Sequence, residues 1–160
     1  MTKADAPHRD MLVDEDANAD LVQPLIAISK ATRQFVAIKL MEIGVVAGQD
    51  QLLDALDPSE PRAVCFVAQS LSVRPSTVSK MLDILERRGW CRREADETDM
   101  RRTFIRLTTE GHRMRSQVRR IWAEVNGDLA RALPQNDLSV LEAALWNAER
   151  LVSGRLSRLR

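Results

Sequence analysis

Apolar residues recur along most of this chain at spacings of three and four, the period of an amphipathic helix. The helices that this spacing predicts cover residues 21–44, 49–56, 63–71, 75–88, 109–133 and 137–156. Proline suits the first position of a helix and glycine its end, so Pro75 and Gly89 mark the limits of the fourth helix. Pro134 separates the last two helices, and Thr108 or Thr109 is expected to cap the first of them.

The helix that begins at Pro75 has two different faces. Its apolar stripe consists of Val78, Met81, Leu82 and Leu85. The opposite face holds Ser76, Lys80, Asp83 and Arg87, flanked by Thr77 and Ser79. One face can therefore be buried while the other offers short hydrogen-bonding side chains to a partner.

Two short segments after this helix are typical of strands, Trp90–Glu94 and Thr103–Leu107. The residues between them include Asp99 and the pair Arg101-Arg102, so a two-stranded hairpin with a basic tip is expected. The fold class predicted from the pattern is mainly α with a small β-hairpin.

The net charge of +1 conceals an uneven distribution along the 160 residues. Residues 1–20 carry −4, 21–61 carry −2, 62–120 carry +7 and 121–160 carry no net charge. Thirteen of the fourteen basic side chains in the third segment are arginine, which is well shaped for phosphates and guanine edges. This distribution indicates a nucleic-acid partner for the middle of the chain.

The first nineteen residues are acidic and poor in apolar side chains, so a disordered tail is expected there. No segment has the apolar length of a signal peptide or of a membrane span, which favours a cytoplasmic protein without a membrane partner. Cys65 and Cys91 are expected to be reduced, with Cys65 buried in the apolar run of the third helix.

The order of these elements resembles the winged helix-turn-helix of the MarR family, the multiple antibiotic resistance type of bacterial transcriptional regulators. The resemblance extends from Leu21 to about Leu156, and its most specific part runs from Val67 to Gly111. Within that part, Asp99, Arg101 and Leu107-Thr108 match the aspartate, the arginine and the Leu-Thr pair of the family's wing signature.

The resemblance assigns a role to each polar residue of the second helix and of the wing. The residues that it implies at bases and phosphates of the major groove are Ser76, Thr77, Ser79 and Lys80. Arg74, just before them, is expected to reach a phosphate. Arg101 and Arg102 are the expected wing contacts in the minor groove, and Asp99 positions the arginine. Two positions depart from the family pattern: Arg74 replaces a capping serine, and Met100 replaces the arginine that usually follows the aspartate.

The implied organisation is one MarR-like domain over residues 20–160, after the tail of residues 1–19. Residues 45–108 would form the DNA-binding lobe, and residues 20–44 and 109–160 would form long helices that pair with a second copy. The partners implied are an inverted-repeat operator in double-stranded DNA, the second copy, and a small aromatic or anionic effector that releases a repressor. Phe35, Lys39 and Trp122 are of a suitable type for the effector, whose binding residues are otherwise unknown.

The same residues bear on three alternative functions. An enzyme is disfavoured because His8 and His112 support neither a catalytic triad nor a metal site, and no cofactor is expected. A winged-helix module for protein contact is less compatible with the basic middle segment. A redox-responsive regulator acting through Cys91 is the remaining alternative.

Overall fold

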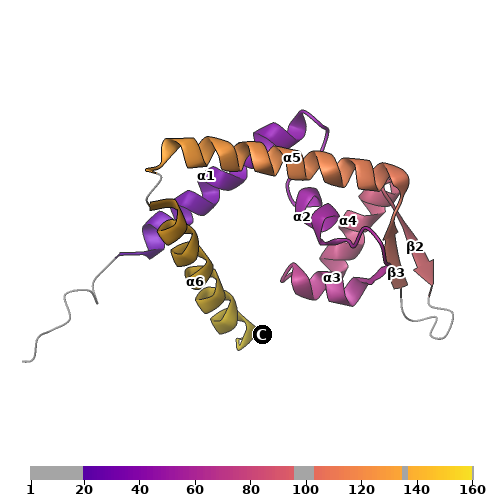
Figure 1. Cartoon of the computed structure of the whole chain (residues 1–160). Helices are drawn as coiled ribbons and strands as arrows, with labels where there is room; N and C mark the ends of the chain where they lie inside the picture. Colours follow the sequence, from indigo (N-terminus) through magenta and orange to yellow (C-terminus); the bar gives the residue numbers. More distant parts are fainter. Residues whose placement is uncertain (1–19, 96–102, 135–136, 160) are drawn as a thin grey trace, which may run out of the picture.

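The computed structural model describes residues 20–95, 103–134 and 137–159, and it is mainly helical with one small sheet (Figure 1). The elements in chain order are α1 (Val22–Met41), α2 (Gln49–Ala55), β1 (Arg62–Ala63), α3 (Val64–Ser70), α4 (Pro75–Arg87), β2 (Cys91–Ala95), β3 (Thr103–Leu107), α5 (Thr109–Ala132) and α6 (Leu138–Ser157). The predicted fold class is confirmed, and the helix bounds lie within about three residues of those expected.

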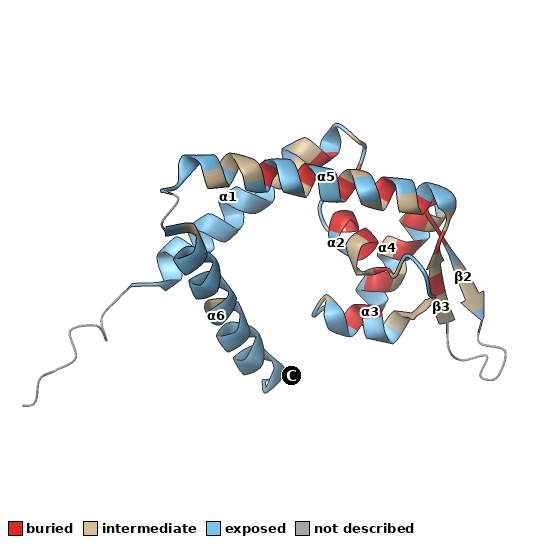
Figure 2. Cartoon of the chain, viewed as in Figure 1, coloured by how far each residue is buried: buried red, intermediate tan, exposed pale blue. Residues whose placement is uncertain are grey.

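The core lies where α2, α3 and α4 meet the sheet and the first half of α5 (Figure 2). From α4, the predicted stripe residues Val78, Leu82 and Leu85 are fully buried, and Met81 packs against them. Burial of a side chain of this size stabilises the fold by about 1.5–3 kcal/mol relative to exposure. The stripe therefore fixes which face of α4 is turned towards solvent.

The sheet has three antiparallel strands in the order β1-β3-β2, one more than the expected hairpin. The added strand is β1, in which Arg62 lies opposite Ile105 of β3. Its two residues are too few to show an alternating pattern in the sequence. Strand β2 begins at Cys91, because the Trp90 N–H still donates to the Leu85 carbonyl at the end of α4.

A compact joint connects the sheet to α5. Thr108 is the cap of α5, as one of the two predicted candidates, and its hydroxyl accepts a hydrogen bond from the Gly111 N–H at 3.0 Å. The same hydroxyl donates to the Gly89 carbonyl at the end of α4. A Cβ at position 111 would lie 1.8 Å from the Trp90 carbonyl oxygen, so this close approach requires glycine.

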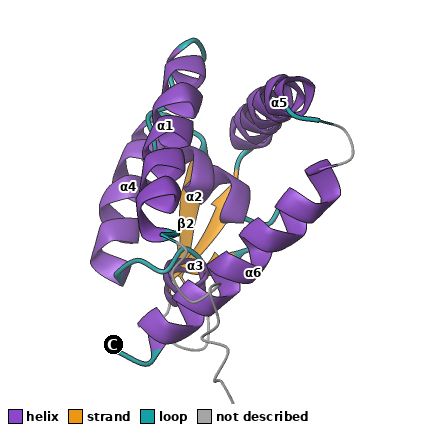
Figure 3. Ribbon diagram, turned by 90° about the vertical axis from the view of Figure 1, so that its left-hand side faces the viewer, coloured by secondary structure: helices purple, strands orange, loops and turns teal. Residues whose placement is uncertain are grey.

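Helices α1 and α6 contribute little to this core. Only Leu40 of α1 is buried, and no described residue of α6 is. In Figures 1 and 3, α6 follows the end of α5 and lies apart from the lobe, with its C-terminal end pointing towards α3. The large apolar side chains that these two helices expose are Val22, Leu25, Ile26, Ile28, Phe35, Ile38 and Met41 on α1, and Val140, Leu141, Leu145, Trp146, Leu151, Val152 and Leu156 on α6.

The two cysteines occupy opposite environments. Cys65 is exposed on α3, so the prediction that it is buried was wrong. The consecutive apolar residues around Cys65 point to all sides of α3, so only some of them can face the core. The buried ones are Val67 and Ala68. Cys91 is buried on β2, and this burial raises the pKa of its thiol to about 11, with a smaller contribution from the Glu86 carboxylate.

We expect Gly111→Ala to destabilise the protein, because the new methyl group would collide with backbone rather than with a movable side chain. The expected loss in the free energy of unfolding is about 1–3 kcal/mol, measured by urea denaturation. Gly154→Ala on α6 is the matched control, since nothing lies within 4 Å of a Cβ there. Alanine is a better helix former than glycine, so the control should gain up to about 1 kcal/mol. Equal stability of the two variants would contradict this account of the joint.

We expect alkylating reagents to distinguish the two thiols. A pKa of about 11 leaves Cys91 with a hundredth of the thiolate of an ordinary cysteine, because each pKa unit is tenfold in the ratio of the two forms. Treatment of the native protein with iodoacetamide at pH 8 should modify Cys65 and spare Cys91, as read by peptide mass spectrometry. Modification of both in urea is the positive control, and rapid native modification of Cys91 would support the redox alternative.

Candidate nucleic-acid interface

A tight turn after α3 sets the direction of α4. The chain reverses at Ser72, which adopts a positive φ of 54°, and the Val73 N–H then donates to the Ala68 carbonyl at 3.0 Å. Helix α4 starts at Pro75 without a side-chain cap, as expected from Arg74 at the capping position. The Arg74 carbonyl instead accepts the N–H groups of Thr77 and Val78.

The structure places the predicted major-groove residues together on the first turns of α4. Arg74, Ser76, Thr77 and Lys80 are exposed, and Ser79 is half-buried beside them. Hydroxyls and cationic side chains on one exposed helix face can donate to base edges and to phosphates. The wing residues Asp99, Arg101 and Arg102 lie outside the described residues, between the ends of β2 and β3.

Arg93 on β2 forms the densest set of polar contacts next to this face. Its backbone N–H donates to a Glu86 carboxylate oxygen at 3.1 Å, and its guanidinium donates to the other oxygen of that carboxylate. The guanidinium also reaches Asp83 at 2.6 Å and the Ser79 carbonyl at 3.1 Å. The hydrogen bond to Asp83 is the largest of the contributions that raise the pKa of Arg93.

No role for Arg93 is predicted above from the sequence, although its neighbours provide a signal. Arg93 lies opposite Ile105, and Ile105 is buried, so the alternation of β2 turns Arg93 towards the α4 side of the sheet. Two acidic residues three apart on α4, Asp83 and Glu86, share one side of that helix. A basic strand position facing an acidic pair predicts an ion-pair cluster.

The two arginines at the end of α4 have different surroundings. Arg88 donates a hydrogen bond to the carbonyl of Gly44, which follows α1. Its guanidinium also lies over the Trp90 ring, and the distance from the guanidinium carbon to the ring centre is 4.8 Å. Arg87 is exposed, and the structure gives it no hydrogen bond or ion pair with any other described residue. Arg87 is therefore a further exposed cation on the same side of α4 as Lys80, and it is not among the contacts predicted from the sequence.

The outer face of the sheet carries a second cationic pair. Arg92 and Arg106 lie directly opposite each other on β2 and β3. Glu94 separates their like charges, since its carboxylate accepts from both arginines at 3.0 Å. The hydrogen bond from Arg106, more than that from Arg92, holds the pKa of Glu94 below its ordinary value.

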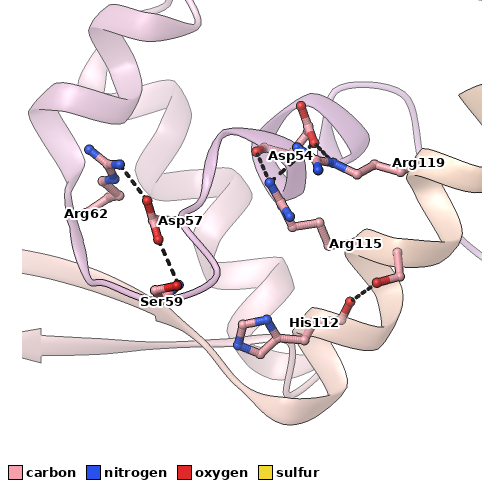
Figure 4. A network of polar contacts seen from close by, with 8 residues as sticks. Asp54, Asp57, Ser59, Arg62, His112, Arg115 and Arg119 are labelled. Carbon is pink, nitrogen blue, oxygen red and sulfur yellow. Dashed lines mark hydrogen bonds and ion pairs between the residues drawn. The ribbon is translucent and has the colours of Figure 1, made fainter.

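Two arginine–aspartate clusters brace the lobe behind this surface (Figure 4). Arg119 of α5 contacts the Asp54 carboxylate at 2.6 Å, and Arg115 donates to the Asp54 carbonyl at 3.3 Å, so α2 is tied to α5. Arg62 contacts Asp57 at 2.6 Å in the loop before β1. The Ser59 N–H and then Arg62 hold the pKa of Asp57 at about 2, below its usual 3.8.

A cavity of about 300 Å³ lies between α1, α2 and α5. Its apolar wall includes Val36, Leu40, Val125 and Leu129, and its polar lining includes Arg33, Asp50 and Asn126. Of the three residues suggested for an effector, Trp122 lines this cavity. Phe35 and Lys39 contact each other instead, with the Lys39 ammonium 5.9 Å from the ring centre.

The described part of the chain lacks two features that are typical of other protein classes. No group of three or more histidine, cysteine, aspartate or glutamate residues there is arranged to hold a metal ion. No described helix is both long enough and apolar enough to cross a bilayer.

Comparison with known proteins gives matches in sequence and in fold. The model of the MarR family matches residues 52–103, from α2 to the start of β3. The HTH-type transcriptional regulator YhbI of Bacillus subtilis is 26% identical over 128 residues, which span 80% of this chain and 83% of YhbI. PecS of Dickeya dadantii, also an HTH-type transcriptional regulator, is 31% identical over 102 residues, which span 63% of this chain and 58% of PecS.

Among solved structures, the complex of Staphylococcus aureus MepR with DNA superposes with a TM-score of 0.72. The two chains are 25% identical, and the match covers 84% of this chain and 98% of MepR. The family match falls on the lobe that contains α4 and the sheet, whereas the fold match extends over the long helices as well. Together these findings show that the chain is similar to transcriptional regulators of the MarR family, in sequence over residues 52–103 and in fold over most of its length.

Proposed function

We propose that the chain binds double-stranded DNA in a sequence-specific manner, with α4 in the major groove and the segment between β2 and β3 in the adjacent minor groove. The observation that carries this proposal is the exposed face of α4, which presents Ser76, Thr77 and Lys80 beside Arg74. MepR has this fold and is bound to DNA in its solved complex, which supports the same use of α4 here.

The composition of this face favours DNA over a protein partner. Interfaces between proteins are enriched in aromatic and apolar anchors at their centres. On α4 the apolar residues Val78, Leu82 and Leu85 are all buried in the lobe, so none of them is available to a partner. Apart from the Asp83 carboxylate, which Arg93 binds, the exposed polar groups are hydroxyls and cations, which suit phosphates and base edges.

The exposed stripes of α1 and α6 support a homodimer. They include Trp146 with 61% and Ile26 with 60% of their surface accessible, in rows along both helices. A row of this kind is larger than the apolar patch that a monomeric protein normally exposes. Closure on a two-fold axis would bury both rows and place two copies of α4 about 34 Å apart, one turn of DNA.

The regulatory part of the proposal is a repressor that a small aromatic or anionic ligand releases from its operator. The cavity lined by Trp122 and Arg33 supports it, because an aromatic ring and a cation suit such a ligand. Its walls belong to α1 and α5, which are dimerisation helices in this proposal, and to α2, which belongs to the DNA-binding lobe. A ligand that binds one arrangement of these helices better than another would shift the spacing of the two α4 helices.

We expect Lys80→Ala and Ser76→Ala to change the sequence preference of DNA binding, because their side chains would meet base edges and phosphates. The measurement is selection from random duplex DNA, followed by titration of the selected duplex at several salt concentrations. Wild-type affinity should fall steeply with salt, and Lys80→Ala should reduce the steepness of the log–log slope by about 1. Lys30→Ala on α1 is the control and should match the wild type. A wild-type slope near zero would refute the proposed interface.

We expect Leu145→Asp with Val152→Asp to separate the dimer, because each charge would be buried without a partner, at a cost of several kcal/mol. Sedimentation at micromolar concentration should then give 18.1 kDa instead of twice that mass. Val46→Asp, at an exposed apolar residue between α1 and α2, is the control and should stay dimeric. Wild-type protein that sediments as a single chain, or a direct-repeat operator, would exclude this assembly.

A further inference from the structure

We propose that Arg93 is a positioning residue for DNA binding, which acts by holding the carboxylates of Asp83 and Glu86 away from the cations of α4. The inference rests on the proposed function, since it concerns the same surface. Arg93 itself is turned towards α4 and keeps 31% of its side chain accessible, so it acts through its neighbours rather than by contact with DNA.

The spacing along α4 explains why Asp83 needs to be held. Asp83 follows Lys80 by three residues and precedes Arg87 by four, and both separations place side chains next to each other on a helix. The Asp83 side chain is 51% accessible, so it lies at the edge of the exposed face. A free carboxylate there would pair with Lys80 or Arg87 and would repel the DNA phosphates.

The observed contacts prevent this pairing. The Arg93 guanidinium donates to the Asp83 carboxylate at 2.6 Å and also to the Glu86 carboxylate. Lys80 and Arg87 have no ion pair with a described residue. A planar guanidinium can serve several acceptors at once in fixed directions, which a lysine ammonium cannot do. One arginine on β2 thus binds two carboxylates of α4, and Lys80 and Arg87 keep no ion pair with a described residue.

The same contacts join the two structural elements that DNA would meet. The Arg93 N–H is bonded to Glu86, and its guanidinium is bonded to the Ser79 carbonyl, so β2 is tied to the middle and to the end of α4. The angle between α4 and the hairpin is therefore set in part by one side chain. Ion pairs as accessible as these contribute little to the stability of the fold. Their main effects are therefore to orient α4 relative to the hairpin and to keep the two carboxylates away from the cations of α4.

A mutant cycle tests this role, with the duplex selected by wild-type protein as the probe and fluorescence anisotropy as the measurement. Arg93→Gln should weaken binding about tenfold and reduce the steepness of the salt slope by about 1 to 2, because Asp83 would then occupy Lys80 or Arg87. Asp83→Asn alone should bind as tightly as wild type or more tightly. The double variant Arg93→Gln with Asp83→Asn should recover most of the lost affinity, since the freed carboxylate is absent.

Recovery in the double variant is the decisive result, because a purely structural role of Arg93 would make the second substitution neutral or harmful. Equal losses in the single and double variants, or no loss in Arg93→Gln, would overturn the inference. Wild-type protein that fails to bind any duplex would instead refute the proposed function. If Arg93→Gln does not fold, Arg93→Lys replaces it in the cycle with the same expected order of affinities.

Arg106→Gln is the matched control for the loss of one positive charge in the sheet. Arg106 lies on the outer face of β3 and pairs with Glu94, away from Asp83. This variant should bind within about twofold of wild type, with no recovery from Asp83→Asn, because general loss of charge acts only as a screened, distant effect. A tenfold loss in Arg106→Gln would show that net charge, rather than the placement of Asp83, determines affinity.

Discussion

The burial of one face of α4 is the constraint on which the rest of the interface depends. Val78, Leu82 and Leu85 have no accessible surface, and they pack against residues of α2, α3 and the sheet. Successive residues of a helix are about 100° apart, so a shift of one residue in this packing would turn Lys80 out of the exposed face. The core beneath α4 therefore determines which polar groups reach solvent, although none of the core residues could contact DNA.

The arginines of the middle segment divide into two groups with different physical roles. Arg88, Arg93, Arg115 and Arg119 are bound to carbonyl or carboxylate groups of the lobe and hold its parts together. Arg74 and Arg87 are exposed, and neither is bonded through its side chain to a described residue. A count of charges along the sequence finds the basic segment but does not separate these groups, because the separation depends on which acids lie opposite in space.

The same distinction explains what could be predicted from the sequence. Helix α4 and its two faces follow from local spacing, as do the cap at Thr108 and strand β3, since each is determined by neighbours within a few residues. The short strand β1 and the exposure of Cys65 depend on segments distant in the chain. The partners of Arg93 are only 7 to 14 residues away, but their contact depends on how β2 packs against α4. An apolar run shows that a helix is partly buried, but it does not show which of its sides faces the core.

Helix α5 is the element through which the lobe and the exposed stripes can influence each other. Its 24 residues correspond to about 36 Å of helix. The first half is buried in the lobe through Met114 and Val118, whereas Leu129 and Leu133 near its end are exposed on the side of α6. The ion pair of Arg119 with Asp54 and the close approach at Gly111 attach the first half to the lobe. The second half of α5 contributes Trp122, Val125 and Leu129 to the cavity shared with α1 and α2, so the same helix lies against the lobe and against this cavity.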